Sequence, residues 1–205
     1  MNQQPTSRDG AVEGTLKCWR TIAKEVDCLT DRLGKRVDRG ITAAVVALRA
    51  LGFRTRASCQ GHLTWGIKAP WVDIGVIPPA KLLRSLMDDP KKHSHPEIRS
   101  VRTENLKEQE RLFSILEQFY RARKYLAVGR IILVPHSYGA VRLINQLADI
   151  QEILLASRRA ARLRRFQAEM NDFAAFLKRR YFEDRRAARK PGGSRTAPTK
   201  TKPHS

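Results

Sequence analysis

Residues 129–144 constrain the fold more than any other part of the chain. They read GRIILVPHSYGAVRLI, in which two short apolar runs flank a Pro–His–Ser–Tyr–Gly segment. Apolar runs of this length on either side of turn residues are typical of a β-hairpin. The segment therefore predicts two adjacent strands joined by a tight turn.

Two further strands are predicted at residues 53–59 and 71–77, because both segments are flanked by Gly and Pro and the second is rich in β-branched residues. Before them, residues 38–52 place apolar side chains three and four apart, which predicts a helix. We expect the Asp38 carboxylate to cap this helix and Gly52 to end it. Other helices are predicted over residues 16–33, 80–87, 103–124 and 147–190.

These elements predict an α/β fold with a small mixed sheet of about four strands, covered by helices, and a long basic C-terminal helix. We expect residues 15–146 to form the α/β domain and residues 147–190 to form a helical arm that leaves it. The two ends, residues 1–14 and 191–205, are polar or rich in Pro, Gly, Thr and Lys, which predicts disorder.

The charge balance is the strongest functional signal. The chain has 40 Lys and Arg residues against 20 Asp and Glu residues, for a net charge of +20. A charge this large repels itself unless an anionic partner screens it, and nucleic acid is the commonest such partner, ahead of an anionic membrane surface. The predicted nucleic-acid contacts lie on the C-terminal helix: Arg158, Arg159, Arg162, Arg164, Arg165, Lys178, Arg179, Arg180, Arg185 and Arg186.

Phe166, Phe173 and Phe176 alternate with these cations. Their helical spacing favours packing over base stacking, because no aromatic motif of a known RNA-binding module accompanies them. A helix that packs on the body, on a second copy or on a membrane surface is the alternative interpretation of the same pattern.

The three cysteines, together with a polar N-terminus and apolar runs too short for a membrane span, predict a cytoplasmic protein without a membrane-spanning segment.

Ser137 lies in a segment, VPHSYGA, that shares half of the G-x-S-x-G nucleophile elbow of α/β-hydrolases. We do not predict a hydrolase, because Pro135 stands in place of the first Gly and a strand follows where the elbow requires a helix. The one His after this segment is His204, in the predicted tail.

The turn Ser58-Cys59-Gln60-Gly61-His62 is the main candidate for a chemical site. Gly61 allows close backbone approach to a ligand, and a thiolate is a nucleophile or metal ligand. The alternative is a buried, inert cysteine beside a surface histidine. Candidate catalytic residues are Cys59, His62 and Asp73. Candidate ligand-binding residues are Ser58, Gln60, Gly61, Ser137 and Arg142.

Cys59 and His62 have C-x-x-H spacing, which supplies two metal ligands where a structural zinc site needs four. Because the sequence offers no second fixed pair, it predicts no metal site.

Residues 26–62, which include Asp27, Gly34 and Asp38 before the SCQGH turn, resemble the start of the wybutosine-synthesising protein 3 family. The sequence departs from the family's S-C-S-G-R type turn at Gln60 and His62. The resemblance implies an α/β fold and modification of a tRNA base next to the anticodon, with S-adenosylmethionine as methyl donor. The chain contains no G-x-G-x-x-G nucleotide loop.

Together these patterns predict a protein that binds nucleic acid, RNA in preference to DNA, with a ligand site at the SCQGH turn. One alternative is an S-adenosylmethionine-dependent RNA-modifying enzyme. Another is a non-catalytic interaction protein of a mobile element.

Overall fold

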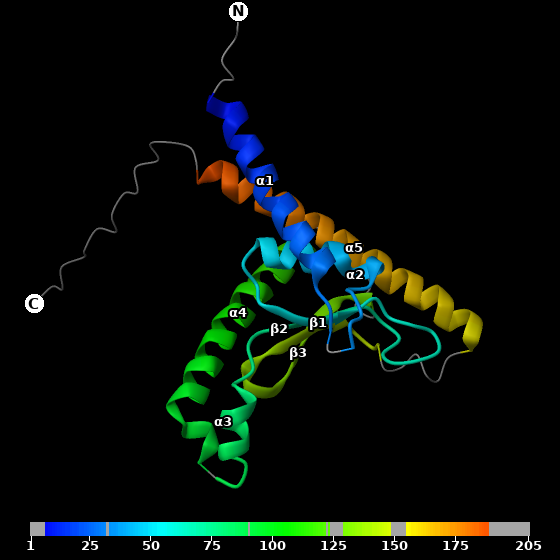
Figure 1. The fold of residues 1–205 in the computed structure, drawn as a ribbon. Helices are drawn as coiled ribbons and strands as arrows, with labels where there is room; N and C mark the ends of the chain where they lie inside the picture. The colour runs from blue at the N-terminus through cyan, green and yellow to red at the C-terminus, as the bar shows by residue number, and fades with distance from the viewer. Residues whose placement is uncertain are drawn as a thin grey trace, which may run out of the picture.

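The computed structural model describes residues 7–31, 33–89, 91–121, 123, 129–148 and 155–188 (Figure 1). Its elements are, in chain order, α1 (Ser7–Cys28), α2 (Arg39–Ala50), β1 (Thr55–Cys59), β2 (Trp71–Ile74), α3 (Ala80–Ser85), η1 (Lys92–Ser94), α4 (Pro96–Arg121), β3 (Ile131–Pro135), η3 (Ser137–Gly139), β4 (Val141–Asn145) and α5 (Ala156–Ala187). The elements η1 and η3 are single turns of 3₁₀ helix.

The four strands form one sheet in the order β1-β2-β4-β3. The α/β class is therefore confirmed, and so is the predicted hairpin, in which Leu133 pairs with Leu143 across the turn. All three strand pairings are antiparallel, so the sheet is not mixed. Strand β1 lies at one edge of the sheet, with Cys59 opposite Trp71 of β2.

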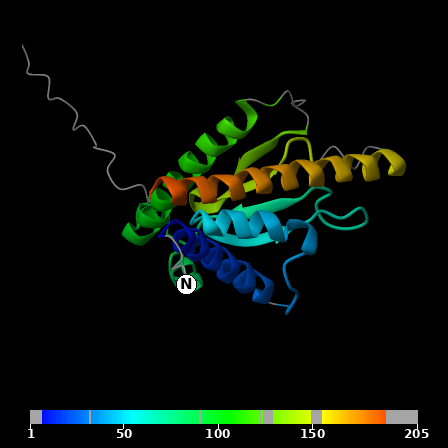
Figure 2. The ribbon, with the colours of Figure 1, turned by 90° about the horizontal axis from the view of Figure 1, so that it is seen from above.

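One face of the sheet carries the main core. Residues on successive positions of a strand point to opposite faces, and Val72, Ile74 and Leu143 point to the face that α2, α4 and α5 cover. Helices α2 and α5 lie side by side over this face, with α1 beside α2 (Figures 1 and 2). The other face carries Trp71 and Arg142, both half-buried.

Helix α5 belongs to the body, so the expectation of an arm that leaves the α/β domain is wrong for its described part. The residues Leu163, Phe166, Met170, Phe173, Ala174, Leu177 and Tyr181 are buried along one side of it. They recur every three or four positions, which makes a continuous apolar stripe. Its central residues, Met170, Phe173, Ala174 and Leu177, share the main core with residues of α2 and α4, whereas Phe166 packs with Ala69 and Ile144 in a second cluster. The predicted packing role of the phenylalanines is confirmed for Phe166 and Phe173, which are both buried.

The ends of several helices differ from the sequence-based boundaries. Helix α1 begins at Ser7 and ends at Cys28, so the predicted disorder is wrong for residues 7–14. Helix α4 begins at Pro96, whose fixed φ and missing N–H suit a first helical position. Helix α5 begins at Ala156, and residues 149–154 and 189–205 lie outside the described part of the chain.

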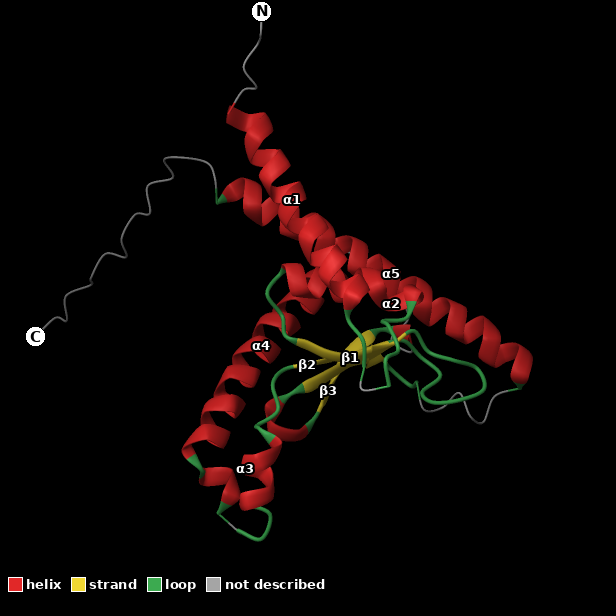
Figure 3. Ribbon diagram, viewed as in Figure 1, coloured by secondary structure: helices red, strands yellow, loops and turns green. Residues whose placement is uncertain are grey.

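Figure 3, coloured by secondary structure, shows that helices make up most of the fold and that the short strands lie near its centre. Among the described residues, no helix combines the length and the apolar character that crossing a membrane requires.

Candidate functional site

The start of α2 and the SCQGH turn are joined by two hydrogen bonds, each between a side chain of one segment and the backbone of the other. Asp38 precedes α2 as predicted, but its carboxylate does not cap the helix. Instead the amide oxygen of Gln60 accepts a hydrogen bond from the backbone N–H of Gly40 at 3.0 Å. The Asp38 carboxylate in turn accepts one from the backbone N–H of Gln60 at 3.1 Å. This pair of bonds satisfies the helix end from outside and turns the carboxylate toward the cysteine.

Two glycines permit this close approach. A Cβ at Gly40 would lie 2.6 Å from the amide oxygen of Gln60, so a larger residue would displace that cap. Gly61 has a φ of +80°, and its Cβ would lie 2.7 Å from the backbone of Ala69. A side chain there meets both backbone strain and a steric clash. The structure explains Gly61 by a close approach of the chain's own loop, and its predicted contact with a ligand stays a prediction.

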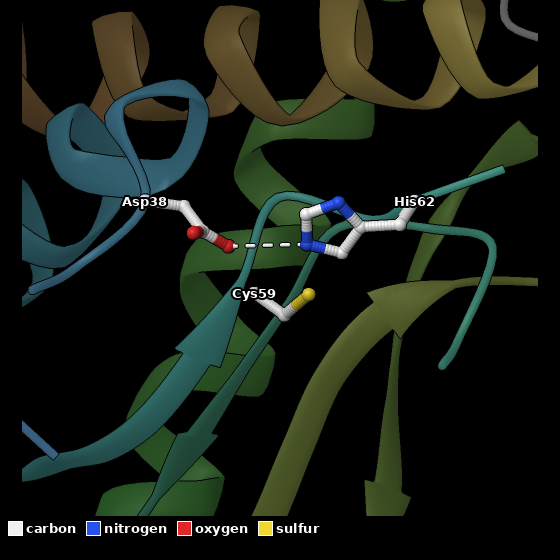
Figure 4. Close-up of side chains that lie close together, drawn as sticks. All are labelled: Asp38, Cys59 and His62. Atoms are coloured by element: carbon white, nitrogen blue, oxygen red, sulfur yellow. Dashed lines mark ion pairs between the residues drawn. The ribbon is translucent and has the colours of Figure 1, made fainter. Parts of the chain in front are cut away.

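Asp38, Cys59 and His62 form a compact cluster (Figure 4). One ligand atom from each of the three residues lies within 4.8 Å of the other two. The Nε2 atom of His62 is 3.6 Å from Oδ2 of Asp38. Cys59 ends β1, and the left-handed backbone of Gly61 turns the chain so that His62 returns toward the thiol. We call this group the DCH cluster.

Each member of the DCH cluster is held by a further contact. The Cys59 thiol accepts a hydrogen bond from the backbone N–H of Gly61 at 3.4 Å. The imidazole of His62 stacks on the indole of Trp65, with 3.7 Å between ring centroids. Burial raises the pKa of the Cys59 thiol, and the Gly61 N–H opposes that change. The thiol is therefore mostly protonated at neutral pH.

The cluster opens onto a cavity of about 490 Å³ between β1 and residues 29–38, which we call the β1 groove. Asp38 and Cys59 contribute to its wall, as does Ser58. Two aromatic side chains, Trp65 and Trp71, also line it. Four cations line the groove: Lys35, Arg36, Arg49 and Arg56. This is a cationic and aromatic surface on the edge strand of the sheet.

Asp73 and Arg142 neutralise one another on the second face of the sheet, where Asp73 is buried and Arg142 is half-buried. The guanidinium donates two hydrogen bonds to the carboxylate, at 2.7 and 2.9 Å. It also lies 4.0 Å from the ring centroid of Trp71. The pairing raises the pKa of Arg142, and the nearby guanidinium favours the thiolate of Cys59. A carboxylate engaged in this way positions Arg142 and is not a free acid or base.

Ser137 is not part of this site, so its prediction as a ligand-binding residue beside the SCQGH turn is wrong. It begins the 3₁₀ turn between β3 and β4, which packs on α4. Strand register places Val141 opposite Ile74, whereas Cys59 lies opposite Trp71, at the other end of β2. A hairpin turn between antiparallel strands also lacks the strand-to-helix turn of a hydrolase elbow.

The outward side of α5 carries the predicted cations. Some are engaged within the protein: Arg180 pairs with Asp184, and Lys178 lies over the ring of Trp19. Others have no ion-pair partner among the described residues: Arg158, Arg159, Arg164, Arg165, Arg179 and Arg186. We call these six residues the α5 arginine face.

The N-terminal half of α5 adjoins the SCQGH turn. The side chain of Gln167 donates a hydrogen bond to the backbone carbonyl of Gln60 at 3.0 Å. A cavity of about 550 Å³ separates this end of the helix from the loop after the turn. Leu63, Thr64, Lys68, Ala156 and Arg159 line the cavity. The arginine face and the DCH cluster therefore lie on neighbouring parts of one body.

Sequence reasoning missed Asp38 and Trp65 as members of the site. Asp38 had a helix-capping role that explained it, and Trp65 lay in a loop without a pattern. Asp38 lies 22 positions before Gln60, so only the fold shows that the two residues meet. Trp65 lies close to His62 in the sequence, and an aromatic residue beside a histidine was the signal that could have found it. No family model, curated protein or solved structure matches this chain.

Proposed function

We propose that this protein binds nucleic acid, RNA in preference to DNA. The observation that carries the proposal is the α5 arginine face, because six guanidinium groups that have no acidic partner in the described part of the chain lie along one helix. Buried neighbours hold that helix on the body, so the charges are presented on a rigid surface. Arginines in such an array bind phosphates and release the counterions condensed on the backbone.

The preference for RNA rests on the β1 groove. Trp65 is 58% exposed, and its indole is fixed from one side by His62. An exposed ring beside cations suits unpaired bases, which stack on aromatic side chains while the backbone phosphates meet arginine and lysine. RNA presents unpaired bases in its loops and single strands, whereas duplex DNA does not. No helix of the described fold carries a base-reading motif, so we expect binding that tolerates sequence.

The test is a matched pair of charge variants. One replaces Arg164, Arg165, Arg179 and Arg186 of α5 by Gln. The other replaces Lys81, Arg84, Arg99 and Lys107 of α3 and α4 by Gln and removes the same charge. All eight side chains are exposed. Affinity for a single-stranded RNA and for duplex DNA of equal length is measured by fluorescence anisotropy at fixed salt.

We expect the α5 variant to lose most of its RNA affinity and the control variant to keep it. Circular dichroism checks that both variants fold. Equal losses in the two variants would mean that net charge alone attracts the polyanion and that α5 is not the interface. The absence of RNA binding by the unmodified protein at low salt would refute the proposal.

An RNA-modifying enzyme is a second candidate, because the DCH cluster lies beside the proposed interface. Its test is binding of S-adenosylmethionine by calorimetry. Binding that is lost in Cys59→Ala and in His62→Ala would support the enzyme. No binding by the unmodified protein would remove S-adenosylmethionine as the cofactor.

A further inference from the structure

We propose that the DCH cluster is a binding site for a transition-metal ion of the zinc class, with a coordination position open to the β1 groove. This inference goes beyond nucleic-acid binding and does not depend on it. It rests on the way in which three different donor atoms from two separate segments of the chain meet at one point.

The three donors suit such an ion chemically. A thiolate and an imidazole prefer zinc and similar ions over magnesium or calcium, which prefer oxygen ligands alone. Three protein ligands leave one position of a tetrahedral ion for water or a ligand, as in catalytic zinc sites. The carboxylate of Asp38 and the thiolate of Cys59 would together balance the charge of a divalent ion.

The geometry favours metal binding over a nucleophile with a base. In a Cys-His-Asp relay, the acid and the thiol contact different nitrogens of the imidazole. Figure 4 shows the Asp38 carboxylate and the Cys59 thiol on the same side of the His62 ring, toward Nε2. Convergence on one nitrogen cannot relay a proton through the ring. It is the arrangement that three ligands of one ion require.

The Nε2 atom of His62 supplies an independent observation. It is shielded from solvent and has no hydrogen-bond partner within the described part of the chain, because Oδ2 of Asp38, at 3.6 Å, is within ion-pair distance but too far for a hydrogen bond. Buried polar atoms are normally paired, and each one left unpaired lowers stability. A metal ion between Asp38 and Cys59 would give this nitrogen a partner.

The ligands are also held in place by groups that do not bind the ion. Backbone N–H groups of Gln60 and Gly61 donate to the Asp38 carboxylate and the Cys59 thiol. The Trp65 indole fixes the plane of the imidazole. Outer contacts of this kind orient metal ligands and raise affinity. Binding replaces the thiol proton of Cys59, which is released to solvent as the sulfur–metal bond forms.

The open position would face the cations of the β1 groove. Asp38 and Cys59 are both wall residues of that groove, beside Arg36 and Arg56. A ligand that reaches the ion from this side passes positively charged side chains. An anionic oxygen, such as that of a phosphate or a carboxylate, is therefore the class of ligand that fits the open position.

The test uses the full-length protein after treatment with a chelator and dialysis. Zinc content is measured after incubation with Zn²⁺ and removal of the free ion, and Co²⁺ is titrated as a spectroscopic substitute. We expect a single ion per chain and a thiolate-to-cobalt charge-transfer absorption. Cys59→Ser should abolish the absorption and the retained zinc.

Two controls separate this site from adventitious binding. The double variant Cys18→Ser/Cys28→Ser changes the two exposed cysteines and should keep both signals. Asp38→Asn keeps the side-chain size and should lose retained zinc, which decides the matter if Cys59→Ser does not fold. The proposal is overturned if the unmodified protein retains no zinc. It is also overturned if Cys59→Ser or Asp38→Asn binds zinc as the unmodified protein does.

Discussion

The replacement of Phe173 by Ala tests whether α5 is packed on the body along its apolar side. The Phe173 side chain is fully buried, and its ring meets that of Phe119 edge-on with 5.1 Å between centroids. Removal of a phenyl ring from a packed core lowers the free energy of unfolding by about 3–5 kcal/mol. The edge-on contact with Phe119 places the expected loss toward the upper part of that range.

Phe113 on α4 provides the matched control. Its side chain is 57% exposed, so the same Phe→Ala change should alter the free energy of unfolding by no more than about 0.5 kcal/mol. Both variants are compared with the unmodified protein by urea denaturation, with fluorescence and circular dichroism as probes. Similar losses for the two variants would contradict the packing of α5 on the sheet.

A second measurement separates packing from base stacking at the same position. Phe173→Leu keeps most of the apolar volume but has no aromatic ring, so it should fold and bind RNA as the unmodified protein does. Loss of a stacking ring would instead weaken RNA binding by about 1–3 kcal/mol. A loss of that size in a folded Leu variant would refute the assignment of Phe173 to the core.

Two further predictions concern the SCQGH turn. Gly61→Ala should destabilise the fold by more than about 1 kcal/mol, because a Cβ there meets the loop backbone at a positive φ. Gly66→Ala, at a positive φ but with no atom within 4 Å of its Cβ, should cost less when both are measured by thermal unfolding. Cys18 and Cys28 should react rapidly with a thiol reagent, whereas buried Cys59 should react at a comparable rate only after unfolding. Rapid modification of a third thiol in the native protein would contradict the burial of Cys59.

Local patterns predicted the elements of this fold well. The hairpin of β3 and β4 follows from two apolar runs around a turn, and α2 follows from its regular apolar spacing. The burial of Phe166 and Phe173 follows in the same way from the period of α5. Each of these features depends on residues that are close together in the sequence, so the local spacing of apolar residues is sufficient to predict it.

Long-range relations could not be predicted in the same way. The many cations of α5 suggested an arm that leaves the body. The apolar residues of α2 and α4 that cover part of its buried side are distant in sequence, so their contact with α5 could not be predicted from local patterns. Asp38 was assigned to its local helix because a capping role was sufficient, and only the fold shows that Gln60 takes that role. Ser137 was named as a candidate ligand-binding residue together with the SCQGH turn, although the strand register places the two at opposite ends of β2.

The salt dependence of RNA binding tests the central claim most directly. For a single strand, the slope of log affinity against log salt concentration is about 0.7 per phosphate contact, so six engaged arginines would give a slope of about 4. Replacement of Arg164, Arg165, Arg179 and Arg186 by Gln should lower that slope by about 3. A slope that these replacements leave unchanged, or an affinity that does not vary with salt, would contradict the assignment of α5 as the nucleic-acid interface.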